Sequence, residues 1–175
     1  QFRYLGVRFL PGMFTRLSGV AASELSQTVA LMSDVLPELS KRLAAGLNSD
    51  TDLPGITALF NDYFLRQAER PPWPADPRFD EAMHRLMGSR AETALEKGLQ
   101  TGLSARQLRR LFHFYVGDSP KVFSNVVRFQ RLLRMQSANA TAFAEKAWLD
   151  AGYYDQAHFI KEFRRFGGIT PGSIG

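Results

Sequence analysis

The side chains in this sequence that are best suited to hydrogen-bonding a ligand are basic and amide groups, and they recur in two similar segments. Residues 101–120 read TGLSARQLRRLFHFYVGDSP, and residues 151–171 read AGYYDQAHFIKEFRRFGGITP. An arginine can donate two hydrogen bonds to guanine, and a glutamine can pair with adenine through one donor and one acceptor. Long donors of this kind on one helix face suit the base edges and phosphates of DNA.

The two segments share a pattern that is typical of a helix-turn-helix. Each begins with a glycine turn, continues with a helix-capping residue, Ser104 or Asp155, and ends with glycine followed by Ser-Pro or Thr-Pro. Apolar residues recur on one face of each expected helix, which leaves the opposite face free to enter a major groove. On these free faces we expect Arg106, Gln107, Arg109, Arg110 and His113 in the first segment and Gln156, His158, Lys161, Arg164 and Arg165 in the second.

A long helix is expected between the two segments. Residues 120–135 carry apolar side chains at helical spacing, and at 1.5 Å per residue such a helix spans roughly 24 Å. A rigid connector of that size could hold two recognition helices near one DNA turn apart, about 34 Å.

Upstream, the sequence predicts a short β remnant followed by helices. Residues 2–10 are rich in aromatic and β-branched residues and precede a Pro-Gly turn, which favours one or two short strands. Apolar residues then recur every three or four positions from Leu25 to Leu43, with Ser23 as the helix cap. Pro37 interrupts this stripe, so we expect a short helix, a break and a second helix that ends near Gly46.

Residues 71–77, PPWPADP, are expected to form a stiff, extended boundary between two parts of the chain. We assign residues 1–72 to a first domain with short strands and then helices. We assign residues 73–175 to a domain with helix-turn-helix units at about 91–116 and 140–167. Further helices are expected over 53–69, over 91–99 and from Pro77, the last with Phe79, Met83, Leu86 and Met87 on one face.

Composition narrows the function. Cysteine is absent, which excludes disulfides, thiol nucleophiles and thiolate metal sites, and the three histidines are far apart, so we expect no metal and no cofactor. No apolar run is long enough to cross a membrane, and no spacing of catalytic groups predicts an enzyme.

The charge is unevenly distributed along the chain. Residues 1–89 hold nine Lys/Arg and ten Asp/Glu, whereas residues 90–175 hold thirteen Lys/Arg and seven Asp/Glu, so the excess positive charge lies in the second half. This charge favours an anionic partner such as nucleic acid.

The runs GYYDQAHFIKEFRRFGGITP and LSARQLRRLFHFYVGDSPKVFSNVVRFQRLL resemble the C-terminal DNA-binding domain of the AraC/XylS transcriptional regulators, over roughly residues 76–172. The resemblance implies a mainly α fold and a bacterial, cytoplasmic activator that binds double-stranded promoter DNA and contacts RNA polymerase. It also implies a sensory domain that binds a small-molecule effector. Most of that domain is missing from a chain that starts at Gln1, and residues 1–72 are its remnant. The resemblance is compatible with either a monomer or a homodimer. The DNA-binding residues we assign are Arg106, Gln107, Arg109, Arg110, Gln156, Ala157, His158, Lys161 and Arg164.

Some positions depart from the family pattern or leave two interpretations open. Lys97 lies in the first helix of the first unit, where the family usually has an apolar residue. Trp148 lies in the first helix of the second unit, where the family usually has a small residue. Ile160 could contact a thymine methyl or be buried, and burial is the preferred interpretation. Arg128 matches a characteristic family arginine, which could bind phosphate or stabilise the fold. The alternative function for the whole chain is a helical dimerisation or protein-interaction module, with the Leu25–Leu43 stripe as its surface and an incidental basic charge.

Overall fold

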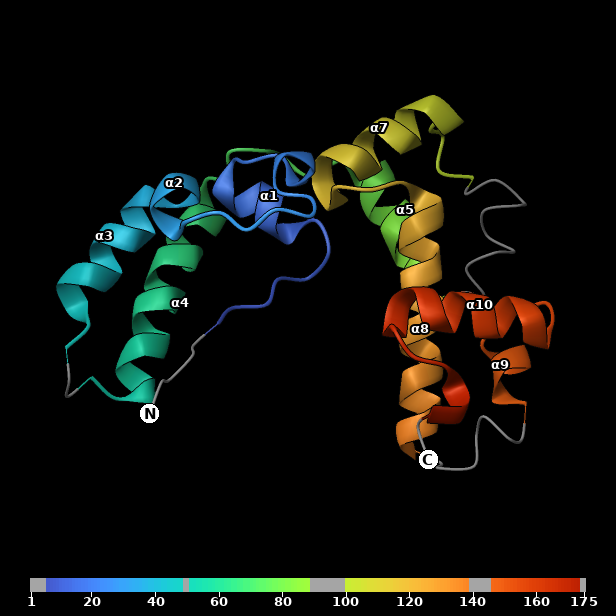
Figure 1. The fold of residues 1–175 in the computed structure, drawn as a ribbon. Helices are drawn as coiled ribbons and strands as arrows, with labels where there is room; N and C mark the ends of the chain where they lie inside the picture. The colour runs from blue at the N-terminus through green and yellow to red at the C-terminus, as the bar shows by residue number, and fades with distance from the viewer. Residues whose placement is uncertain (1–5, 49–50, 89–99, 139–145, 174–175) are drawn as a thin grey trace. The chain divides into compact units, whose positions relative to one another are not determined.

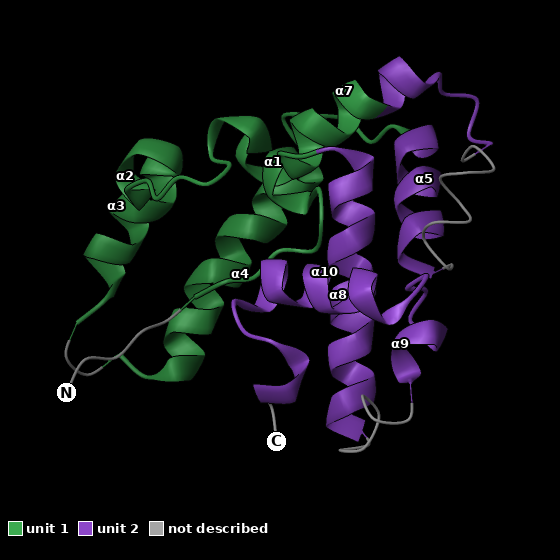
Figure 2. Ribbon diagram, turned by 45° about the vertical axis from the view of Figure 1, so that its right-hand side comes forward, with its two compact units in different colours: residues 1–76, 109–118 green, residues 77–108, 119–175 purple. Residues whose placement is uncertain are grey.

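The computed structural model describes residues 6–48, 51–88, 100–138 and 146–173, and these residues are mainly helical (Figure 1). The helices pack into two compact units, coloured separately in Figure 2. Unit 1 consists of residues 1–76 and 109–118, and unit 2 of residues 77–108 and 119–175. The division expected at residues 72 and 73 stays a prediction. In the described part of the chain, no helix is long and apolar enough to cross a membrane.

Unit 1 is built around α4, which spans Leu53–Glu69 and confirms the helix expected over these residues. Its core joins the buried side chains of Leu36, Leu39 and Leu43 to Tyr63 of α4. The break at Leu36 is confirmed, because Pro37 begins a new helix there and that helix ends at Gly46. The other elements of this unit are α1 (Met13–Ser18), η1 (Ala22–Glu24), α2 (Met32–Val35) and α3 (Pro37–Gly46).

Two expectations for the N-terminal part are wrong. Residues 6–10 form no strand, since no second strand is present among the described residues to pair with them; Phe9 instead packs edge-on against Phe14 and Phe64, with ring centroids 5.3 and 5.0 Å away. Residues 2–5 lie outside the described residues. The apolar stripe from Leu25 is also not continuous, because Val29 is fully exposed and the chain is not helical between residues 25 and 31.

Unit 2 is organised by α8, Pro120–Ala138, which confirms the expected long helix and extends it by three residues. The helices α5 (Pro77–Gly88), α9 (Ala147–Asp150) and α10 (Gln156–Gly167) each pack against α8 (Figure 1). In α5, Phe79, Met83 and Leu86 are buried as expected, but Met87 is 46% exposed and does not belong to that face. The short helix η2, Pro171–Ser173, follows α10.

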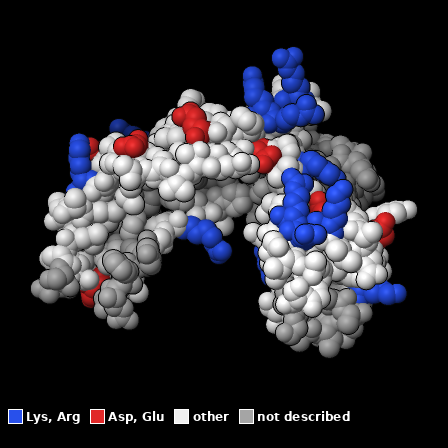
Figure 3. All heavy atoms as spheres, viewed as in Figure 1, with Lys and Arg blue, Asp and Glu red and all other residues white. Residues whose placement is uncertain are grey.

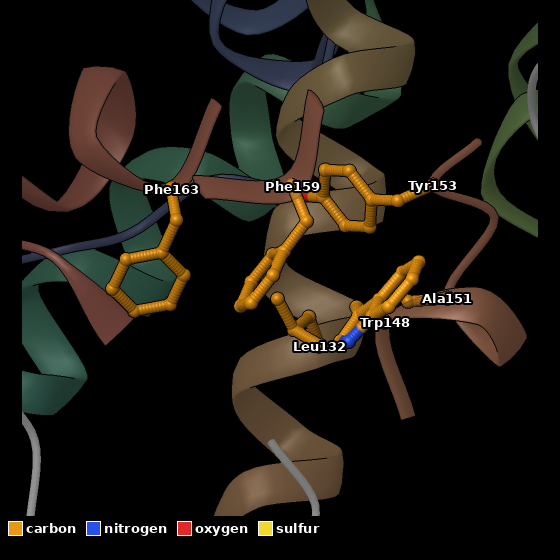
Figure 4. Close-up of a cluster of buried hydrophobic side chains, with 6 residues drawn as sticks. All are labelled: Leu132, Trp148, Ala151, Tyr153, Phe159 and Phe163. Carbon is orange, nitrogen blue, oxygen red and sulfur yellow. The ribbon is translucent and has the colours of Figure 1, made fainter. Parts of the chain in front are cut away.

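The core of unit 2 lies where α9 and α10 meet α8. Figure 4 shows how its buried side chains converge from three elements. Phe159 and Phe163 of α10 point toward Leu132 of α8, while Trp148, Ala151 and Tyr153 come from α9 and the turn after it. This core fixes which face of α10 is buried, and hence which face remains open to solvent.

Candidate nucleic-acid interface

The helix α10 begins at a turn whose geometry the sequence dictates. Gly152 has a φ of +97°, a conformation that side-chain-bearing residues rarely adopt. The turn is closed by the Tyr153 amide, which donates to the Trp148 carbonyl oxygen at 3.0 Å. Asp155 then caps the helix, because its Oδ1 accepts from the His158 amide at 2.7 Å. The expected glycine turn and capping residue of the second segment are both confirmed.

Trp148 packs at the centre of this arrangement. Its ring is stacked on Phe159, with a centroid distance of 6.1 Å and an interplanar angle of 5° (Figure 4). Phe159 in turn meets Phe163 and Tyr153 edge-on. The bulky residue at position 148 is therefore accommodated by flat stacking against the buried face of α10.

A buried charged network ties α10 to α8. Arg128 Nη2 lies 2.6 Å from Glu162 Oε2, and the two side chains are only 3% and 9% exposed. Asn125 bridges the pair: its Nδ2 donates to Glu162 Oε1 at 2.8 Å, and its Oδ1 accepts from Arg128 Nη2 at 3.1 Å. Arg128 also donates to the Gly152 carbonyl oxygen and lies 4.7 Å from the Tyr153 ring centroid. Of the two roles left open for Arg128, the structure gives the stabilising one.

The outer face of α10 carries most of the predicted DNA-binding residues of the second segment. Gln156, Ala157, Lys161 and Arg164 are exposed, and Figure 3 shows Lys and Arg atoms gathered over this helix. Within the described residues, Lys161 and Arg164 make no ion pair. His158 is only one-third exposed, lies edge-on to the Tyr153 ring, and has its Nε2 3.9 Å from Glu162 Oε2. It is thus at the rim of the exposed face.

The same face is hollowed. An open groove of about 610 Å³ is lined by one small, one large apolar and three basic side chains, namely Ala157, Ile160, Lys161, Arg164 and Arg165. Ile160 is 38% exposed, so the preferred interpretation that it is buried is wrong. The reason is its position: Phe159 and Glu162–Phe163 turn toward α8, and position 160 faces away from them.

The helix α7, Ala105–Val116, begins with a reciprocal cap. The Gln107 amide donates to Ser104 Oγ at 3.3 Å, and the Ser104 amide donates to Gln107 Oε1 at 2.9 Å. This is the capping box, in which two otherwise unpaired amide donors are satisfied. The assignment of Gln107 to DNA binding stays a prediction, and its side-chain oxygen also caps the start of the helix.

The other residues of α7 that are predicted to bind DNA lie on its solvent-exposed face. Arg106, Arg109 and Arg110 are exposed, as is His113, and none makes an ion pair with a described residue. Figure 3 shows a group of Lys and Arg atoms over α7. The opposite face is buried through Phe112 and Tyr115.

From residue 109 onward, α7 packs within unit 1. The Trp73 ring lies edge-on to Phe114 at 5.1 Å, and its Nε1 donates to the Gly19 carbonyl oxygen at 3.0 Å. The Tyr115 hydroxyl donates to the Pro74 carbonyl oxygen at 3.2 Å. The fully buried Thr15 donates to the Phe114 carbonyl oxygen at 3.5 Å. No local pattern in the sequence predicts this anchoring by upstream residues.

Parts of both expected helix-turn-helix units lie outside the described residues. These parts are the helix expected over 91–99, which includes Lys97, and residues 139–145. In the described ranges, no group of three or more His, Asp or Glu residues could hold a metal ion.

A family model described as a helix-turn-helix domain matches residues 99–174, which include α7, α8, α9 and α10. This match, to a helix-turn-helix of the AraC type, supports a C-terminal DNA-binding domain like that of the AraC/XylS regulators. Domains of this kind belong to DNA-binding transcription regulators and not to an enzyme family. No curated protein and no solved structure matches the chain. The match is consistent with the mainly α fold of residues 100–138 and 146–173.

Proposed function

We propose that this chain is a sequence-specific regulator that reads two adjacent major-groove segments of promoter DNA, one with α7 and one with α10. The observation that carries the proposal is that both helices have one buried apolar face and one exposed basic face. Positive charge without internal partners attracts phosphates, because neutralising them releases counterions. A helix of this form can enter a major groove, with its exposed side chains toward the base edges.

The proposed roles follow from each side chain's chemistry and exposure. Gln156, Lys161 and the three arginines of α7 are assigned to base edges, because their donors match purine acceptors. Arg164 lies near the end of α10 and is assigned to a phosphate. Ala157 is assigned to close apolar contact, and His158 to the rim of the interface. We assign Gln107 mainly to its capping role, with its amide Nε2 as the group that could reach DNA.

The test is selection of binding sites from randomised duplex DNA by the full chain, at one stated salt concentration. Two enriched half-sites about 10–10.5 base pairs apart are expected, since two helices on one DNA face read successive turns. A single enriched half-site would refute the two-helix reading. If the protein retained no DNA even at low salt, the DNA-binding proposal itself would be wrong.

Variants separate base readers from phosphate contacts. Gln156→Ala is expected to relax preference at one base pair, at a cost of about 1–3 kcal/mol on the preferred sequence. Arg164→Ala is expected to weaken binding to all sequences alike and to lower the slope of log affinity against log salt by about 1. Equal base preference in the wild type and Gln156→Ala would remove Gln156 from the readout. Glu24→Ala, on unit 1, is a control that should leave both measurements unchanged.

The family resemblance extends the proposal to the complete protein. We propose that it acts in the bacterial cytoplasm as an activator that contacts RNA polymerase and responds to a small-molecule effector upstream of these helices. A homodimer is compatible with this, but two reading helices on one chain make it unnecessary. Transcription in vitro from a promoter carrying the selected site tests activation: output that does not rise when the protein is added would contradict it.

A further inference from the structure

The exposed face of α10 is not purely polar. Ile160 is the one large apolar residue in the groove of that face, and it lies beside Lys161 and one turn before Arg164. It is 38% exposed and contributes nothing to the core formed by Phe159 and Phe163. A β-branched residue also lowers helix propensity slightly, so helix formation gives no reason for isoleucine at this exposed position.

The surroundings of Ile160 indicate what could cover it. The groove is lined by Lys161, Arg164 and Arg165, and Figure 3 shows basic atoms gathered over this helix. Such a rim suits a polyanion and not a neutral or cationic protein surface. An apolar side chain surrounded by cations therefore has to meet an apolar group on an anionic partner. In a DNA major groove, the group with that character is the 5-methyl of thymine.

We propose that Ile160 is a specificity-determining residue, which packs against a thymine 5-methyl group in the half-site read by α10. This inference rests on the proposed function and adds a base preference to it. The contact is made by dispersion and by removal of apolar surface from water, and it involves no hydrogen bond. Ile160 therefore discriminates thymine from cytosine or uracil, which lack the methyl group, and does so independently of Gln156.

The test replaces each thymine of the selected site, one at a time, by deoxyuridine. This change removes the methyl group and leaves base pairing intact. For the wild-type chain, one position in the α10 half-site should lose affinity about fourfold, the equivalent of burying one methyl group. For Ile160→Ala, affinity for the unmodified site should fall by a similar or larger factor, and deoxyuridine at that position should have no further effect. At all other thymines, deoxyuridine should change the affinity of Ile160→Ala by the same factor as that of the wild type.

A matched control is Ile169→Ala, which removes an exposed isoleucine (47%) that follows α10 and should retain the wild-type deoxyuridine profile. Trp148 fluorescence checks that each variant keeps the α10 core. The inference is overturned if Ile160→Ala shows the wild-type profile at every thymine, even though DNA binding and site selection are normal. A chain that selects no DNA sequence overturns the proposed function as well, so the two failures are distinguishable.

Discussion

Removing Glu162 should destabilise unit 2 far more than removing Glu162 and Arg128 together. The variant Glu162→Leu leaves the guanidinium of Arg128 buried, 3% exposed, without the carboxylate that lies 2.6 Å from it. Breaking a buried ion pair by removing one partner typically costs about 3–5 kcal/mol, because the remaining charge is neither solvated nor compensated. We expect a loss of this size in the free energy of unfolding.

The double variant Arg128→Met/Glu162→Leu removes both charges and keeps similar apolar volume. The double variant removes the partners of the Asn125 amide, which bonds to both residues in the native protein, and the Arg128 donor to the Gly152 carbonyl oxygen. An unsatisfied buried amide costs about 1–3 kcal/mol. The double variant should therefore be more stable than Glu162→Leu alone, and the coupling energy between the two sites should amount to several kcal/mol.

The assay is urea unfolding followed by the fluorescence of Trp148. The only other tryptophan is Trp73, in unit 1, so all variants carry Trp73→Phe and the signal reports on unit 2 alone. The exposed pair Arg85–Glu81 of α5, also 2.6 Å apart but with side chains 39% and 46% exposed, is the control. Its coupling should not exceed about 0.5 kcal/mol. The reasoning is refuted if the double variant loses as much stability as the single variants Arg128→Met and Glu162→Leu combined.

Three further predictions concern stability. Gly117→Ala should destabilise unit 1 by about 1–3 kcal/mol, because φ is +85° and an added Cβ would lie 2.9 Å from the Ala22 carbonyl oxygen; an unchanged urea midpoint, measured in a chain that keeps Trp73 as the reporter in unit 1, would contradict this. Ser124→Ala should stabilise unit 2 by about 1 kcal/mol, because this fully buried hydroxyl has no hydrogen bond in the described part of the chain; a lower midpoint would argue against it. Burial raises the pKa of Tyr63 above 10.0, an effect that Arg42 opposes. The folded state thus retains the Tyr63 proton to a higher pH than the unfolded state does, and the free energy of unfolding falls as the pH rises above about 10. Tyr63→Phe should flatten this fall, and parallel stability curves for the two proteins would contradict the assignment.

Local signals in the sequence predict the elements that depend on them. Asp155 and Ser104 cap their helices as expected, because a capping bond needs only three neighbouring residues. Pro37 ends one helix and begins another for an equally local reason. The helix over residues 53–69 follows from apolar spacing within the segment itself.

Features that depend on distant partners could not be predicted. Val29 continues the apolar spacing of the Leu25–Leu43 stripe but is fully exposed, because no described element covers it. Glu162 pairs with Arg128 across 34 residues, and the sequence shows only that each lies among the apolar residues of its helix. A charged residue in such a position is a signal that could have suggested the pair. The preferred prediction for Ile160 is wrong because an apolar residue beside buried phenylalanines resembles a core position in the sequence.

The two helices proposed to read DNA are anchored in different ways. The buried face of α10 rests on α8 through the Arg128–Glu162 pair and the aromatic core, all within unit 2. From residue 109 onward, α7 is instead held by residues far upstream, including Thr15 and Trp73. A change in the upstream region that shifts these contacts acts on α7 directly, whereas α10 keeps its own network. Any signal received upstream of residue 76 should therefore change readout of the α7 half-site first.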